Sequence, residues 1–187
     1  MSTVNISVLQ LSQLFAGGAM SVGRSTEHAL RTAARAVQEE ARGMLGTYQV
    51  GNAQFQTWPE LADSTKEERF DLGFPENEPL LRNGELRDHI LYEIELNSFH
   101  GGEAVVGVPS VTVGDGSKQN PFRDIGDIAM WQEMGTDHIP SRSFLGLSAA
   151  RLSPHIARLF GHAMCATIVG DPQEATVQRL DILDITP

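Results

Sequence analysis

The clearest hydrophobic pattern in the chain has the period of a helix. Over residues 26–45, apolar side chains recur at spacings of three and four, which places them on one helical face. They are Leu30, Ala33, Ala34, Val37, Ala41, Met44 and Leu45. The pattern predicts an amphipathic helix, with Ser25 or Thr26 as a cap at its start and Gly43 and Gly46 available to end it.

The N-terminal segment carries a pattern that fits two structures. Between residues 4 and 15, the first apolar side chains alternate as in a strand, and the later ones are spaced as in a helical turn. The sequence Ala16-Gly17-Gly18-Ala19 then breaks the pattern and predicts a hinge. An apolar segment behind a hinge docks either on its own core or on a neighbouring molecule, and both alternatives are open.

The middle of the chain predicts a short helix and a hairpin. Ser64-Thr65 can cap a helix that runs through Arg69, and the Gly, Pro and Asn residues of 71–79 are typical of a loop. Residues 90–96 alternate between apolar and other side chains, and 104–108 form a second apolar run after a glycine-rich turn. These two runs predict an antiparallel β-hairpin.

The following segments predict a loop, a helix and an extended connector. Residues 109–124 are rich in Gly, Pro, Asp and Ser, which predicts a long exposed loop of the kind that is usually functional or disordered. Residues 125–134 predict a short helix that carries Trp131, and residues 144–147 predict a strand or an extended connector.

The last periodic stretch predicts a C-terminal helix. Apolar side chains recur at helical spacing over residues 149–169, where Pro154 is tolerated if it lies in the first turn. Gly170-Asp171-Pro172 would end this helix. The imperfect alternation over residues 175–185 predicts a terminal strand or an extended arm.

Composition and charge narrow the class of protein. The chain has 187 residues, 41% of them hydrophobic and 20% charged, with a formal net charge of −10. An acidic surface repels phosphate, which argues against binding to a nucleic-acid backbone, although an acidic wall can face DNA without holding it. No apolar run approaches the roughly 20 residues that span a bilayer, and the N-terminus lacks the pattern of a secretory signal.

The reactive side chains do not assemble into a recognisable catalytic or metal motif. The lone Cys165 excludes an intramolecular disulfide and a cysteine-based zinc site, and we interpret it as a small buried residue on a helix. The histidines lack the spacing that places two ligands on one helical face, so we expect no metal and no cofactor. They are His28, His89, His100, His138, His155 and His162.

Ser148 lies in the sequence Gly-Leu-Ser-Ala-Ala, which nearly matches the Gly-x-Ser-x-Gly of a nucleophile elbow. A hydrolase of that type needs an acid and then a histidine after the serine. Here His155 and His162 follow on the predicted helix of Ser148 itself, and the later acidic residues come after both. We therefore interpret Ser148 as a helix N-cap rather than as a nucleophile.

The stretch from Glu133 to Leu145 combines a turn, a rigid proline, an arginine and an apolar plug. Gly135-Thr136 predicts a turn, and Arg142 stands between Pro140 and Phe144. A guanidinium there can pair with a carboxylate or with several backbone carbonyl groups. Arg142 is therefore either an exposed loop residue, part of a locked turn, or a clamp between subunits.

Several short motifs follow one another along the chain. They are Trp58-Pro59-x-Leu61-x-x-Ser64-Thr65, Leu80-Leu81-Arg82-Asn83-Gly84-Glu85-Leu86, the Trp131 helix, Glu133-Met134-Gly135-Thr136 and Pro140-x-Arg142-x-Phe144-Leu145. In this order of motifs the chain resembles the tail-completion (virion morphogenesis) family of tailed bacteriophages. Ser143 stands where the family pattern has a second proline. The resemblance covers most of residues 1–168.

The resemblance implies an α+β fold in which a small antiparallel sheet packs against a long N-terminal helix and a C-terminal helix, with extended terminal arms. On this basis we expect an N-terminal arm and glycine hinge over residues 1–24, a main domain over 25–170, and a C-terminal strand or arm over 171–187. Its motif and interface candidates are Trp58, Trp131, Glu133, Gly135, Thr136, Pro140, Arg142, Phe144 and Leu145.

The resemblance also implies a structural role in the virion, without catalysis. Proteins of this family form rings, usually sixfold, at the head–tail junction, between the portal or connector proteins and the tail tube or terminator proteins. DNA would pass through such a ring without specific binding, and no membrane would be involved. The protein would reside in the virion neck, and in the host cytoplasm during assembly. The alternatives are a small serine hydrolase that uses Ser148 and a free-standing protein-binding module.

Overall fold

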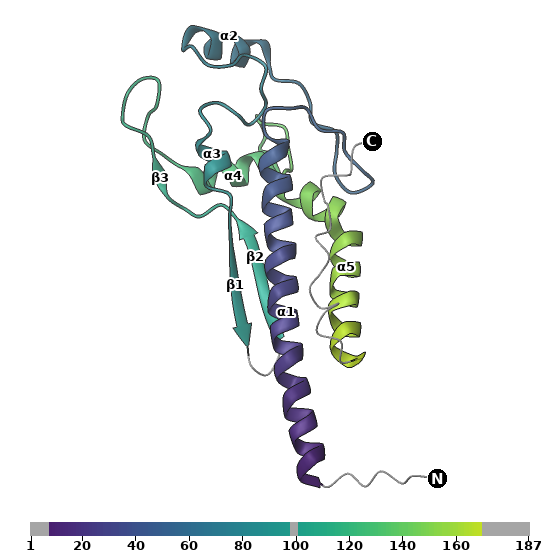
Figure 1. Ribbon diagram of the computed structural model, residues 1–187. Helices are drawn as coiled ribbons and strands as arrows, with labels where there is room; N and C mark the ends of the chain where they lie inside the picture. Colours follow the sequence, from purple (N-terminus) through teal and green to yellow (C-terminus); the bar gives the residue numbers. More distant parts are fainter. Residues whose placement is uncertain (1–7, 98–100, 170–187) are drawn as a thin grey trace. The chain divides into compact units, whose positions relative to one another are not determined.

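The computed structural model describes residues 8–97 and 101–169 (Figure 1). In chain order the elements are α1 (Val8–Met44), α2 (Asp63–Asp71), α3 (Glu85–Asp88), β1 (Leu91–Asn97), β2 (Gly101–Gly107), β3 (Thr112–Val113), β4 (Arg123–Asp124), α4 (Ile125–Met134) and α5 (Leu145–Val169). Small antiparallel two-stranded sheets, β1–β2 and β3–β4, pack against α1 and α5. The expected α+β fold is confirmed.

The chain divides into two compact units that do not follow its linear order. Among the described residues, the smaller unit comprises 8–33, 94–97, 101–104 and 154–169, and the larger comprises 34–93 and 105–153. Helices α1 and α5 and the β1–β2 hairpin each contribute to both units. The three-part division expected from the sequence stays a prediction.

Helix α1 is longer than the sequence pattern indicated. It has 37 residues and continues through Gly17 and Gly18. The hinge predicted at Ala16-Gly17-Gly18-Ala19 is therefore wrong, because the backbone there is helical. A glycine inside a helix costs about 1 kcal/mol relative to alanine, and the Leu, Met and Ala residues around this pair are strong helix formers. Ser25 and Thr26 lie inside the helix and therefore do not cap it.

In the smaller unit, α1 and α5 pack through small side chains. Ala29 and Ala33 form a buried cluster with Leu159 and Ala163. Alanines at these positions let the two helices approach closely. Elsewhere in this unit, a Cβ atom added to Gly102 of β2 would lie 2.5 Å from Leu30 Cδ1 of α1. The absence of a side chain at Gly102 therefore makes room for the leucine.

The larger unit contains the main hydrophobic core. Its buried members are Ala41, Met44, Leu45, Trp58, Leu86, Ile90, Ile125, Ala129, Phe144 and Leu147. Trp58 is only 3% exposed and belongs to this core. Two side chains of α1 secure the start of β1, because Gln38 Nε2 and Arg42 Nη2 donate to the carbonyl oxygen of Ile90, at 2.7 and 2.8 Å.

The short helices differ in detail from the sequence pattern. Helix α2 is present as expected, but its N-cap residue is Ala62, which makes no side-chain cap, and Ser64 lies within the helix. The chain turns at Asn83-Gly84, where Gly84 has a φ of +86° that favours glycine. It leads into the helical turn α3 and only then into β1.

The segment 109–124 is anchored rather than a free loop. It contains the β3–β4 ladder, in which Thr112 pairs with Asp124. The carboxylate of Asp124 caps α4 by accepting from the backbone N–H groups of Gly126 and Asp127, at 2.8 and 3.1 Å. Ser110 Oγ donates to the same carboxylate, and this hydrogen bond lowers the pKa of Asp124. Most of the segment nevertheless lacks regular structure and is exposed, as expected, so only the short ladder that anchors it differs from the loop prediction.

Helix α5 starts earlier than the sequence pattern indicated. Residues 145–147, expected to be extended, form its first turn, and Pro154 lies in its interior rather than in its first turn. Cys165 on this helix is exposed, so its interpretation as a buried residue is wrong. The strand or arm expected over 175–185 lies outside the described residues. Within the described ranges, no helix combines the length and apolar character that crossing a bilayer requires.

Candidate functional site

The connection between α4 and α5 gathers most of the residues singled out from the sequence. It opens with Gly135, whose φ is +78° and whose missing side chain leaves room for the returning backbone: an added Cβ would lie 2.9 Å from Ser141 N. Thr136 then closes a turn, because its N–H donates to the carbonyl of Ile139 at 2.8 Å and its Oγ1 accepts from Ile139 N. Pro140 follows on the surface.

Arg142 locks this connection to a distant part of the chain. Its Nε and Nη2 donate to the carbonyl oxygen of Pro59 at 3.2 and 3.1 Å, and Nη2 also donates to that of Glu60 at 3.0 Å. The side chain is buried, with 4% exposure, and this desolvation lowers the pKa of Arg142. Of the three alternatives for Arg142, the structure supports the locked turn.

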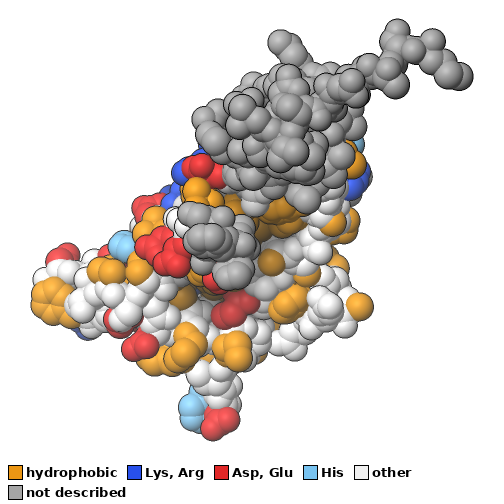
Figure 2. All heavy atoms as spheres, turned by 90° about the horizontal axis from the view of Figure 1, so that it is seen from below, with side chains coloured by type: hydrophobic (Ala, Val, Ile, Leu, Met, Phe, Trp, Pro, Cys, Tyr) orange, Lys and Arg blue, Asp and Glu red, His pale blue; other side chains and the backbone are white. Residues whose placement is uncertain are grey.

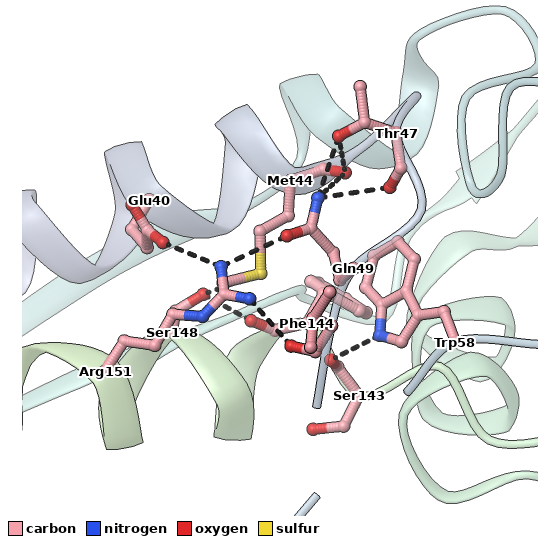
Figure 3. A network of polar contacts seen from close by, with 10 residues as sticks. Glu40, Met44, Thr47, Gln49, Trp58, Ser143, Phe144, Ser148 and Arg151 are labelled. Carbon is pink, nitrogen blue, oxygen red and sulfur yellow. Dashed lines mark hydrogen bonds and ion pairs between the residues drawn. The ribbon is translucent and has the colours of Figure 1, made fainter. Parts of the chain in front are cut away.

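Two more hydrogen bonds join the same segments. Trp58 Nε1 donates to the carbonyl of Ser143 at 3.1 Å, and Figure 3 shows the indole pointing toward that oxygen. Gln56 Nε2 donates to the carbonyl of Ser141, also at 3.1 Å. Segments that are about 85 residues apart in sequence are therefore held side by side by side-chain donors and backbone acceptors.

Glu133 caps the N-terminus of α5 from the last turn of α4. Its Oε2 accepts from the backbone N–H groups of Phe144 and Leu145 at 2.8 and 3.0 Å. Its Oε1 accepts from Gly146 N at 2.9 Å and from Ser143 Oγ at 2.5 Å. A carboxylate at this position satisfies helix N–H groups that would lack a partner and complements the helix dipole.

This cap explains why the chain becomes helical at residue 145. The sequence marks Glu133 as a candidate but does not reveal this role, because the residue is more than ten positions ahead of the N–H groups that it binds. Phe144 beside it is fully buried and Leu145 packs partly against the main core. We name this arrangement of Trp58, Glu133, Arg142 and Phe144 the α4–α5 lock.

Trp131 does not belong to the α4–α5 lock. It lies on α4 and is 43% exposed. Met130 and Met134 on the same helix are also exposed, at 55% and 77%. These three residues form what we call the α4 apolar face. Large apolar side chains that gather on a surface mark interaction sites more often than isolated ones do. The role of Trp131 as an interface candidate stays a prediction.

Ser148 is a buried structural residue. It lies inside α5 with no exposed surface, so the N-cap interpretation is wrong. Its Oγ donates to the carbonyl of Phe144 in the same helix and lies 3.7 Å from Met44 Sδ (Figure 3). None of the histidines in the described part of the chain hydrogen-bonds to it.

Replacing Ser148 with alanine is expected to lower the free energy of unfolding by less than about 1 kcal/mol. The carbonyl of Phe144 keeps its bond from the backbone N–H of Ser148, so no buried acceptor is left unpaired. Urea denaturation of Ser148→Ala beside the unmodified protein measures the change. A loss above about 2 kcal/mol would mean that the hydroxyl makes a more important contact than the structure assigns to it.

A second polar network, not found from the sequence, surrounds Arg151. Its Nη1 donates to Gln49 Oε1 at 3.1 Å and pairs with Glu40 Oε1 at 3.3 Å, and its Nη2 donates to the carbonyl of Val50 at 2.9 Å (Figure 3). The Glu40 side chain is partly buried in this ion pair. The network joins α5 to the segment that follows α1 within the larger unit.

The structure brings no metal-binding cluster together within the described ranges. His28, His138 and His162 are exposed, and His155 Nδ1 lies 2.8 Å from Arg158 Nη2. His100 lies outside the described residues.

Comparison of the chain with protein-family models, curated proteins and solved structures finds no significant match. The resemblance to the tail-completion family therefore depends on the order of short motifs, and its implications for function are proposals.

Proposed function

We propose that this protein is a structural component of a tailed bacteriophage that forms a ring at the head–tail junction. In this role it joins the tail to the portal or connector and lines the DNA channel, and it acts by binding copies of itself and neighbouring virion proteins. The channel role requires no specific contact with DNA.

The observation that carries this proposal is the α4–α5 lock. The motifs behind the resemblance come from distant parts of the sequence, yet Trp58, Glu133, Arg142 and Phe144 make one connected set of contacts. All of these contacts satisfy backbone groups or fill the core, which is what a fixed structural element needs. Such an element supports a rigid assembly surface.

Surface chemistry also supports an assembly role. The α4 apolar face leaves two methionines and a tryptophan in contact with water, at a cost that a protein partner would remove. On the side drawn in Figure 2, hydrophobic side chains lie among acidic ones. The net charge of −10 fits a channel wall that repels the DNA backbone.

The proposal is tested in purified particles. A phage that lacks the gene is expected to accumulate heads and tails that do not join, and electron microscopy would show this. The unmodified gene supplied in trans should restore joined particles that contain the protein. Normal particles without the protein would refute the role, and so would its absence from particles that the unmodified phage produces.

The structure gives less support to the serine hydrolase alternative. Ser148 is fully buried, and its hydroxyl donates to a carbonyl group of its own helix. A nucleophile needs a base within hydrogen-bond reach and access for a substrate. The Ser148→Ala variant therefore also separates the two functions, because the neck role predicts that this variant restores joined particles.

A further inference from the structure

A pocket of about 570 Å³ in the larger unit is lined by four arginines. They are Arg69, Arg82, Arg123 and Arg142. The chain has 14 basic residues and 24 acidic ones, so a cluster of four guanidinium groups opposes its overall charge. A concentration of positive charge in a partly enclosed site attracts anionic groups.

Nearby carboxylates neutralise only part of this charge. Glu85 Oε2 pairs with Arg123 Nη2 at 2.7 Å, which accounts for one arginine. Glu68 Oε1 lies 3.8 Å from Arg82 Nη2, and the Glu68 side chain is 63% exposed. Glu60, also at the pocket, is 83% exposed and pairs with a lysine outside it. Exposed ion pairs of this kind are weak, so these two carboxylates compensate little of the positive charge of the arginines.

The other two arginines bind only neutral groups among the described residues. Arg69 Nη1 donates to the carbonyl of Glu78 at 2.6 Å, and Arg142 donates to the carbonyls of the α4–α5 lock. Burial, followed by the nearby charge of Arg82, lowers the pKa of Arg69. Both guanidinium groups keep a full positive charge next to the pocket, because arginine stays protonated at neutral pH.

The pocket also offers aliphatic contacts and unpaired polar atoms. Its apolar lining includes Leu80, Leu86, Ile125, Ile128 and Ile139. Two lining residues carry a buried atom without a hydrogen-bond partner, the donor Arg82 Nε and the acceptor Gln132 Oε1. Both atoms are closed off from solvent, so a ligand in the pocket meets the guanidinium ends and the apolar walls instead.

We propose that this pocket binds a peptide segment of a partner protein in which carboxylate side chains are interspersed with aliphatic ones. The carboxylates pair with the guanidinium groups, and the aliphatic side chains contact the leucine and isoleucine walls. A small inorganic anion would leave these apolar walls uncovered. This inference goes beyond the proposed head–tail role. It concerns peptide binding by the isolated protein, which is measured independently of particle assembly.

A synthetic hexapeptide, Leu-Asp-Ile-Leu-Asp-Ile with blocked ends, is a suitable probe. Its sequence is that of residues 180–185 of this chain. Titration of the full-length protein with the fluorescently labelled peptide is expected to show saturable binding. A version with both aspartates changed to asparagine should bind at least about 10-fold more weakly, since charge-assisted hydrogen bonds are lost. A version with alanine in place of the aliphatic residues should also bind more weakly.

Matched protein variants locate the binding. Arg82→Gln is expected to weaken binding of the hexapeptide about 10-fold. Arg87→Gln makes the same change in charge at an exposed arginine that does not line the pocket, and it should leave the affinity unchanged. Thermal melting of both variants checks that each remains folded.

Four results would overturn the proposal. They are the absence of binding, equal affinity for the asparagine or alanine peptides, equal effects of the two arginine variants, and displacement of the peptide by an equal concentration of inorganic phosphate. The last result would mean that the pocket is a general anion site rather than a peptide site.

Discussion

Replacing Arg142 with methionine is expected to lower the free energy of unfolding by about 3 kcal/mol. Methionine keeps most of the length of the buried stem but removes every donor. The carbonyl groups of Pro59 and Glu60 then lose the three hydrogen bonds from the guanidinium. These hydrogen bonds are partly buried, and a hydrogen bond to a charged group contributes about 1.5–3 kcal/mol. Urea denaturation followed by tryptophan fluorescence measures the change, because Trp58 lies in the same lock.

Two variants control for other causes. Arg142→Lys keeps the charge, but a single ammonium cannot reproduce the forked geometry, so we expect an intermediate loss of about 1–2 kcal/mol. Arg87→Met replaces an exposed arginine with methionine in the same way, and we expect the free energy of unfolding to fall by no more than about 0.5 kcal/mol. Equal losses for Arg142→Met and Arg87→Met would show that the lock contributes nothing to stability.

Replacing Glu133 with glutamine is expected to lower the free energy of unfolding by about 2 kcal/mol. The amide keeps the size of the side chain but turns one of its two acceptors into a donor that faces backbone N–H groups. The variant also loses the favourable interaction of a carboxylate with the N-terminus of α5. Loss of a helix cap typically costs about 0.5–2 kcal/mol, and this residue binds four donors.

The effect should be local as well as global. Amide hydrogen exchange at Phe144, Leu145 and Gly146 is expected to become faster in Glu133→Gln, because the first turn of α5 loses its acceptors. Glu67→Gln on the exposed side of α2 is the matched control and should change neither stability nor exchange. Unchanged protection of the three amides in Glu133→Gln would exclude the capping role.

The sequence indicated the helices and the hairpin because their determinants are local. Both patterns involve residues that are close together in the sequence. They are the helical spacing of Leu30, Val37 and Ala41 and the alternation over residues 90–96. For the same reason, the short helix at 125–134 coincided with α4. Turn chemistry at Gly84 and Gly135 was also local, since both positions need a φ that glycine adopts easily.

Errors occurred where a distant residue supplied the deciding contact. Residues 144–147 look extended from their own composition, yet they start a helix because Glu133 satisfies their N–H groups. Ser148 looks like a cap or a nucleophile, yet the folded core buries it. Cys165 is compatible with burial by type, but its position on α5 leaves it exposed.

The sequence by itself determined the type of the main helices and of the hairpin, the acidic charge and the identity of the candidate residues. Only the tertiary structure decided what those residues do. Arg142 could have been exposed, locked or shared between subunits, and its bonds to Pro59 and Glu60 join positions more than 80 residues apart. The arginine pocket has the same origin, because its four charges come from segments that meet only when the larger unit folds. Periodicity records which face of an element is buried, whereas partners across the core depend on how elements pack.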